Sequence, residues 1–253
     1  MRLIGKRTIQ RIINYNFIRI GRLKRYLDHL RIGVASFPVN DHIKKATAEL
    51  LLFIERDMPE SLVGTIIMDI GCGDGYMLSQ INKKHSNSSF IGISVCNDDI
   101  SLARKRHGVK VKFGDMHSIP QNENTVDTIL ARHVLEHSPM PLFALFEMHR
   151  IMKKGKGILA VVLPAYDSKW VKYEGHFHCM PKDNWMKLFE ESGFNVLFEE
   201  TGCWFAVATN KLEKEWRFIL SPKKDEQFCQ PYKPFYADVF NRLILGLKRL
   251  FSK

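Results

Sequence analysis

Three glycines at alternate positions, Gly71, Gly73 and Gly75, follow an apolar run that contains a single acid, Asp69. Glycine lets the backbone turn sharply, and its missing side chain lets a ligand approach main-chain N–H groups closely. An amphipathic segment comes next, so the pattern predicts a strand, a tight turn and a helix. The N-terminus of such a helix favours a negatively charged ligand group, for example a carboxylate.

The spacing of these glycines distinguishes the turn from two other nucleotide sites. It is G-x-G-x-G rather than the G-x-G-x-x-G of dinucleotide binders, and no Gly-Lys-Ser/Thr follows as in a phosphate-binding loop. The stretch 69–75, Asp-Ile-Gly-Cys-Gly-Asp-Gly, resembles the first motif of class I S-adenosylmethionine-dependent methyltransferases. The resemblance implies S-adenosylmethionine as the cofactor, with Asp69 orienting its methionine part and Gly71, Gly73 and Gly75 bringing the backbone close to it.

Further polar residues fall where later strands are expected to end, which is where doubly wound sheets bind ligands. The family normally holds the ribose with a carboxylate after the second strand, but Ser94 stands there. The strand end resembles a cyclopropane-synthase-like subgroup, so we assign the ribose to Ser94 with Asp99; the alternative is that Asp99 only stabilises a helix N-terminus. Asp115 and Met116 resemble the adenine site, although Asp115 could instead cap its loop.

Three histidines are candidates for the acceptor side. His137 ends the segment 132–137, Arg-His-Val-Leu-Glu-His, which resembles the Val-Leu-x-His segment of the small-molecule methyltransferase branch. His176 and His178 lie in a long connection and share a face if it is extended. Each of the three is a candidate base, the alternative being a packed or solvated histidine. A zinc site here, with Cys179 near, lacks an obvious fourth ligand, so no metal is predicted.

The chain alternates expected strands and helices through its middle part. Strands are expected at 65–70, 90–95, 109–113, 126–131 and 158–163, and helices at 41–58, 77–84, 98–107, 141–152 and 181–192. Two last strands, 195–201 and 203–209, look like an antiparallel pair joined at Gly202. This order predicts an α/β fold with a doubly wound, mostly parallel seven-stranded sheet and helices on both faces. The family resemblance implies the strand order 3-2-1-4-5-7-6.

Positive charge is concentrated at the two ends of this 253-residue chain, whose net charge is +11. Residues 1–31 hold nine Lys and Arg against one acid, residues 211–253 hold ten against five, and the part between is near neutral. We therefore divide the chain into a basic amphipathic N-terminal extension (1–40), an S-adenosylmethionine-binding domain (41–210) and a basic C-terminal extension (211–253). A neutral core argues against a nucleic-acid partner. The basic ends could contact anionic membrane peripherally, or pack on the core or on a second subunit.

The predicted function is methyl transfer from S-adenosylmethionine to a small-molecule or lipid-linked acceptor. Five cysteines without a C-x-x-C pair indicate reduced thiols in a cytoplasmic protein, which could lie peripherally at a membrane surface. Two alternatives stay open. One is an RNA methyltransferase that uses the basic ends as arms, and the other is a catalytically silent subunit that binds S-adenosylmethionine.

Overall fold

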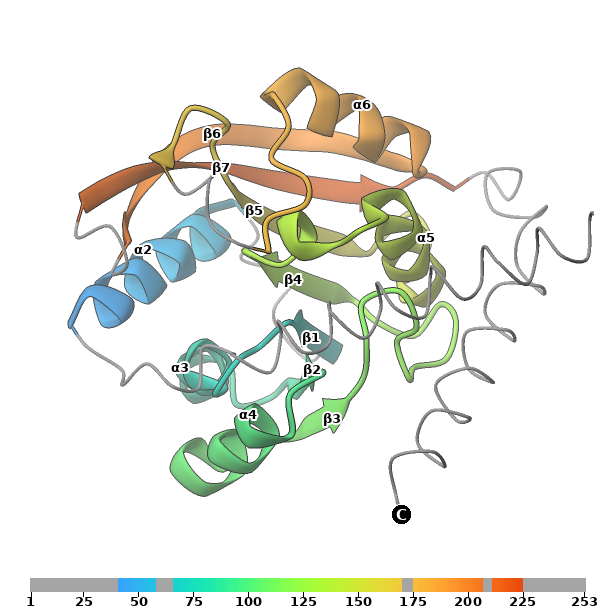
Figure 1. The fold of residues 1–253 in the computed structure, drawn as a ribbon. Coiled ribbons are helices and arrows are strands. Elements are labelled where there is room, and N and C mark those ends of the chain that lie inside the picture. The colour runs from blue at the N-terminus through green and yellow to red at the C-terminus, as the bar shows by residue number, and fades with distance from the viewer. Residues whose placement is uncertain (1–40, 58–65, 170–174, 207–210, 225–253) are drawn as a thin grey trace, which may run out of the picture.

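A computed structural model describes residues 41–57, 66–169, 175–206 and 211–224, and its centre is one seven-stranded sheet (Figure 1). The strand order is β3-β2-β1-β4-β5-β7-β6, with β7 antiparallel to both of its neighbours and the other pairs parallel. This confirms the predicted fold class and strand order. The strands are β1 (Ile66–Ile70), β2 (Ser89–Ser94), β3 (Val111–Phe113), β4 (Thr128–Arg132), β5 (Ile158–Pro164), β6 (Phe194–Ala206) and β7 (Lys211–Pro222).

Helices cover both faces of the sheet. They are α2 (Asp41–Asp57), α3 (Tyr76–Lys84), α4 (Asn97–Leu102) with the π-helical turn η3 (Ala103–His107), the 3-10 turn η4 (Leu135–His137), α5 (Pro141–Ile151) and α6 (Lys182–Glu191). Successive residues of a strand point to opposite faces, so Ile67 packs with α2, α3 and η3 while Met68 packs with α5 and α6. No helix among the described residues is long and apolar enough to span a membrane.

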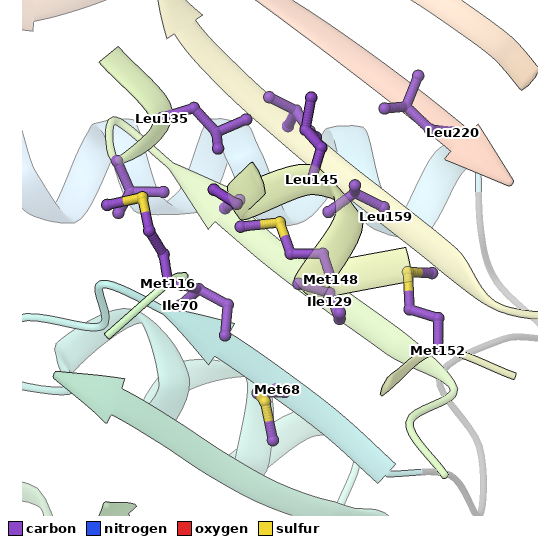
Figure 2. Close-up of a cluster of buried hydrophobic side chains, with 14 of the residues drawn as sticks. Met68, Ile70, Met116, Ile129, Leu135, Leu145, Met148, Met152, Leu159 and Leu220 are labelled. Atoms are coloured by element: carbon purple, nitrogen blue, oxygen red, sulfur yellow. The ribbon is translucent and has the colours of Figure 1, made fainter. Parts of the chain in front are cut away.

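An apolar layer lies between the sheet and the helices on each of its two faces. On one face, side chains of β1, β4 and β5 meet Leu145 and Met148 of α5, all of them essentially inaccessible to solvent (Figure 2). Trp185 and Phe189 of α6 stack with ring centroids 6.1 Å apart, and Phe189 meets Phe218 of β7 edge to face. Because the central strands are covered on both sides, their sequences read as continuous apolar runs rather than alternating ones.

The predicted end of the sheet was wrong. Strand β6 runs straight through Gly202, and its partner β7 begins at Lys211, inside the segment that we assigned to a basic extension. Gly202 marks a close approach rather than a turn, since a Cβ at this position would lie 2.6 Å from the guanidinium of Arg217 on the neighbouring strand. The sheet therefore continues beyond residue 210. The amphipathic segments predicted at the two ends lie outside the described residues.

Candidate active site

The glycine turn after β1 has the conformation that its sequence predicts. Gly71, Gly73 and Gly75 have φ angles of 74°, 53° and 76°, which residues with a side chain rarely adopt. Space is as restrictive as conformation: a Cβ on Gly71 would lie 2.7 Å from a methyl of Val134, and one on Gly75 would lie 2.6 Å from a methyl of Val109. The turn is thus held tightly against the segments that precede β3 and follow β4.

Asp69 lies buried in β1 just before this turn, with 2% of its surface exposed. Its Oδ2 accepts no hydrogen bond from any described residue. Burial raises the pKa of Asp69 to about 7, and the positive charge of Arg132 offsets part of that rise. A buried carboxylate with an unused oxygen is suited to receive a cationic group, and the amino group of S-adenosylmethionine has that chemistry.

Ser94 and Asp99, the predicted ribose pair, are brought together by the fold. Ser94 ends β2 and Asp99 lies in the first turn of α4, and the Ser94 hydroxyl donates to Asp99 Oδ2 over 3.3 Å. The same hydroxyl oxygen accepts the N–H of Cys96 at 3.1 Å. Both side chains are 5% exposed, so the two polar groups face one another at the carboxyl end of β2.

The loop after β3 is joined to the loop after β4 by a chain of short hydrogen bonds. Asp115 Oδ1 accepts the backbone N–H of His117 at 2.7 Å and lies 2.6 Å from its Nδ1. His117 Nε2 lies 2.6 Å from the Ser138 hydroxyl oxygen, which also accepts the N–H of Met140 at 3.1 Å. Asp115 Oδ2 accepts nothing among the described residues, so it is left for the predicted adenine contact, beside the buried Met116.

Two of the three predicted histidines meet across the site. His137 ends η4, and its Nδ1 donates to the Gly175 carbonyl over 3.1 Å. Its ring lies edge to face with that of His176, with ring centroids 4.7 Å apart and the planes at 74°. His178 is not part of this pair, because its Nε2 contacts the Pro139 carbonyl at 3.2 Å. The fold therefore separates His178 from the other two candidates.

Glu136 lies between these groups and was missed at the level of sequence. Its carbonyl accepts the N–H groups of Phe177 and His178, which fastens that segment to η4. Its side chain is fully buried, and neither carboxylate oxygen accepts a hydrogen bond from the described residues. Burial raises the pKa of Glu136 to about 8, while the nearby backbone N–H of Glu136 and the positive charge of Arg132 offset part of the rise and the charge of Glu215 adds to it. The sequence marks Glu136 only by its place in the segment 132–137, directly before His137.

A buried ionic cluster lies where the first half of β7 meets the residues that follow β4. Glu215 is 2% exposed, lies 3.2 Å from His133 Nε2 and accepts Arg217 Nε at 2.7 Å. Burial opposes ionisation of Glu215, but the hydrogen bond of His133 and the charges of Arg132 and Arg217 outweigh it and hold its pKa at about 2. Arg132 thus acts on both Asp69 and Glu215. This cluster was not predicted from the sequence, because the residues of β7 were assigned to a basic C-terminal extension.

Comparison with known proteins defines the class. A family model described as a methyltransferase domain matches residues 40–204, and the chain belongs to this family: it is a class I S-adenosylmethionine-dependent methyltransferase. The site fits the cofactor through the glycine turn and the unused oxygens of Asp69 and Asp115.

Three individual matches illustrate the range of relatives. An O-methyltransferase of Pyrenophora dematioidea is 26% identical over 185 residues, which cover 66% of this chain and 68% of that one. A Mus musculus protein named "Probable tRNA methyltransferase 9B" is 27% identical over 154 residues, covering 60% and 32%. The structure of PH0226 from Pyrococcus horikoshii superposes with a TM-score of 0.61 at 15% identity, covering 78% and 99%. The chain spans about a third of the length of several curated relatives that it matches.

Proposed function

We propose that this protein transfers a methyl group from S-adenosylmethionine to a small-molecule or lipid-linked acceptor. The observation that carries the proposal is the cluster of Glu136, His137 and His176, which lies on segments that follow β4 and β5 at the ligand-binding edge. Apolar side chains accompany it, since Tyr166 and Phe177 are 55% and 51% exposed on the connection after β5. Polar groups beside exposed apolar ones suit an acceptor with a reactive polar atom on an apolar body.

The residues of the chain divide into a cofactor side and an acceptor side. Asp69 would hold the amino group of the cofactor, Ser94 with Asp99 its ribose, and Asp115 with the N–H of Met116 its adenine. When bound, S-adenosylmethionine supplies a methyl group on a positively charged sulfur. The protein contributes alignment of the acceptor with that methyl, exclusion of water, and a place at the histidines where an acceptor hydroxyl loses its proton.

The class of acceptor is tested by labelled-methyl transfer to fractionated cell extract. With the full chain and S-adenosylmethionine labelled in its methyl group, we expect label in the small-metabolite or lipid fraction. The similarity to a protein named tRNA methyltransferase 9B makes RNA the second candidate, and label confined to the RNA fraction would replace our proposal with it. Binding of S-adenosylmethionine without label in any fraction would instead indicate a catalytically silent subunit.

The ribose assignment predicts a selective loss of cofactor affinity. Asp99→Ala should weaken S-adenosylmethionine binding by about 1–3 kcal/mol, the range for removing one partner of a buried hydrogen bond. Asp98→Ala is the matched control: it removes an exposed carboxylate from the same first turn of α4, so it tests for a helix N-terminus effect alone. Calorimetric titration measures both. If Asp99→Ala and Ser94→Ala both bind as tightly as the unmodified protein, the ribose is held elsewhere.

A further inference from the structure

Glu136, His137 and His176 form a compact set of metal-ligand groups. Each offers one ligand atom, and these atoms all lie within 4.8 Å of one another. No metal was predicted from the sequence, because His176 and His178, with Cys179 near, lacked an obvious fourth ligand. The fold supplies a different set, in which an acid and a histidine from η4 meet a histidine that follows them by about forty residues.

The side chain of Glu136 is the independent sign that this set is incomplete without a ligand. A fully buried carboxylate whose two oxygens accept no hydrogen bond within the described ranges is costly unless a bound cation compensates its charge or a proton neutralises it. Arg132 acts on Glu136 electrostatically but donates no hydrogen bond to it. Both histidines that accompany Glu136 are partly exposed, so a cation held here would keep a side open to another ligand.

The orientation of His137 matches that of a metal-binding histidine. A carbonyl oxygen can only accept, so the contact with Gly175 places a proton on Nδ1 and directs Nε2 away from that carbonyl. Metal-binding histidines in proteins almost always donate their second ring N–H in this way, which fixes the tautomer and the ring orientation. The two N–H groups that bind the Glu136 carbonyl hold the segment of His176 in place.

We propose that Glu136, His137 and His176 bind one divalent transition-metal ion. Two imidazoles and one carboxylate are the donor set that such ions prefer, whereas Mg²⁺ and Ca²⁺ prefer oxygen ligands throughout. Three protein ligands leave coordination positions open, which is the arrangement of catalytic rather than structural metal sites.

The position of this metal site restricts the class of acceptor. This part of the inference rests on the proposed function, methyl transfer. Strands β1 and β4 are neighbours, so the residues after β4 lie beside the glycine turn that follows β1. A divalent ion there would lower the pKa of an acceptor hydroxyl and hold its oxygen facing the methyl group. Because His137 and His176 hold the ion in this arrangement, the hydroxyl proton leaves to water rather than to either histidine. The oxygen lone pair forms the O–CH₃ bond, and the S–CH₃ bond breaks with its electron pair remaining on sulfur. The substrate class is thus a hydroxyl compound and the product a methyl ether.

Metal binding can be measured without cofactor or acceptor. The full chain, stripped with a chelator and desalted, is titrated with Zn²⁺ by calorimetry and with Co²⁺ by visible absorption. We expect one equivalent to bind, and Glu136→Gln and His176→Gln each to weaken the affinity by at least about tenfold. His178→Gln is the matched control, two residues along the same segment but outside the cluster, and should leave metal affinity unchanged. Circular dichroism establishes that each variant is folded.

Two results would overturn the metal site: no saturable uptake by the unmodified protein, or equal weakening by His178→Gln and His176→Gln. A second measurement separates this inference from the proposed function. Label transfer at full rate by protein shown to be free of metal would overturn the catalytic role of the ion and leave methyl transfer standing. Stoichiometric metal binding with no label in any fraction would uphold the site and overturn the proposed function.

Discussion

Replacing Asp69 by asparagine should weaken S-adenosylmethionine binding about 10- to 100-fold and at the same time stabilise the free protein above pH 7. The loss of affinity follows from removing a charged partner of the cofactor amino group, worth about 1.5–3 kcal/mol. The gain in stability follows because the unmodified protein buries a carboxylate with an unused oxygen. An ordinary structural carboxylate would show destabilisation instead.

The pH dependence of this gain has a defined sign. The pKa of Asp69 is raised by burial from 3.8 to about 7, so between these values the folded chain binds more protons than the unfolded one. The free energy of unfolding therefore falls as pH rises through this window and is lowest above pH 7. Asparagine does not titrate, so the advantage of Asp69→Asn should grow from near zero at pH 4 to on the order of 2–4 kcal/mol at pH 8.

Denaturant unfolding at pH 5 and pH 8, with calorimetric titration of the cofactor, measures both effects. Asp127→Asn is the matched control. Asp127 directly precedes β4, at the amino ends of the strands and away from the glycine turn, and it accepts the Ile66 N–H and Lys153 Nζ. It should destabilise the protein and leave cofactor affinity unchanged. An Asp69→Asn variant that loses stability at pH 8 would contradict our account of the buried carboxylate.

Gly75→Ala should lower the free energy of unfolding by about 2–4 kcal/mol, far more than Gly108→Ala. Both glycines have positive φ, 76° and 66°, so alanine at either position costs about 1–2 kcal/mol in backbone conformation. At Gly75 the added methyl also meets Val109 at 2.6 Å and Ala103 at 3.1 Å, and such overpacking costs about 1–3 kcal/mol. At Gly108 the methyl meets nothing within 4 Å.

Urea unfolding of the two variants compares the same substitution with and without the steric contact. The difference between them isolates the packing of the turn against the segment before β3. Equal destabilisation by the two would show that conformation alone requires the glycine, and the turn could then shift to admit a side chain.

The sequence predicted the sheet well because its evidence is local. Continuous apolar runs such as 158–163 indicate strands covered on both faces, and the glycines of the turn report positive φ directly. The boundaries of the first five strands fall within two residues of the prediction. The last strand was missed because Glu213, Glu215 and Arg217 give β7 a polar sequence, while their burial depends on partners in other elements.

The predictability of the site depends in the same way on how close its residues are in the sequence. Ser94 and Asp99 are five residues apart, and a strand followed by a helix is enough to bring them together. Contacts that need two separate loops could not be read from spacing. His117 Nε2 lies 2.6 Å from the hydroxyl oxygen of Ser138, which is 21 residues further along the chain. The ring of His137 contacts that of His176, which is 39 residues further along. His117 belongs to no pattern that marks it in advance, and Glu136 is marked only by its place before His137, because each acquires its role from tertiary packing.

The hydrogen-bonded chain from Asp115 through His117 to Ser138 has a consequence for the binding of the two substrates. One end lies at the proposed adenine contact, and the other anchors the turn that leads from η4, with its histidine, into α5. We therefore expect occupation of the adenine end to alter the hydrogen bonding that holds the acceptor end. Coupling of this kind is reciprocal, so each substrate alters the affinity for the other by the same factor. We expect saturating cofactor and saturating acceptor each to change the dissociation constant of the other by an equal factor, which calorimetric titration in both orders measures.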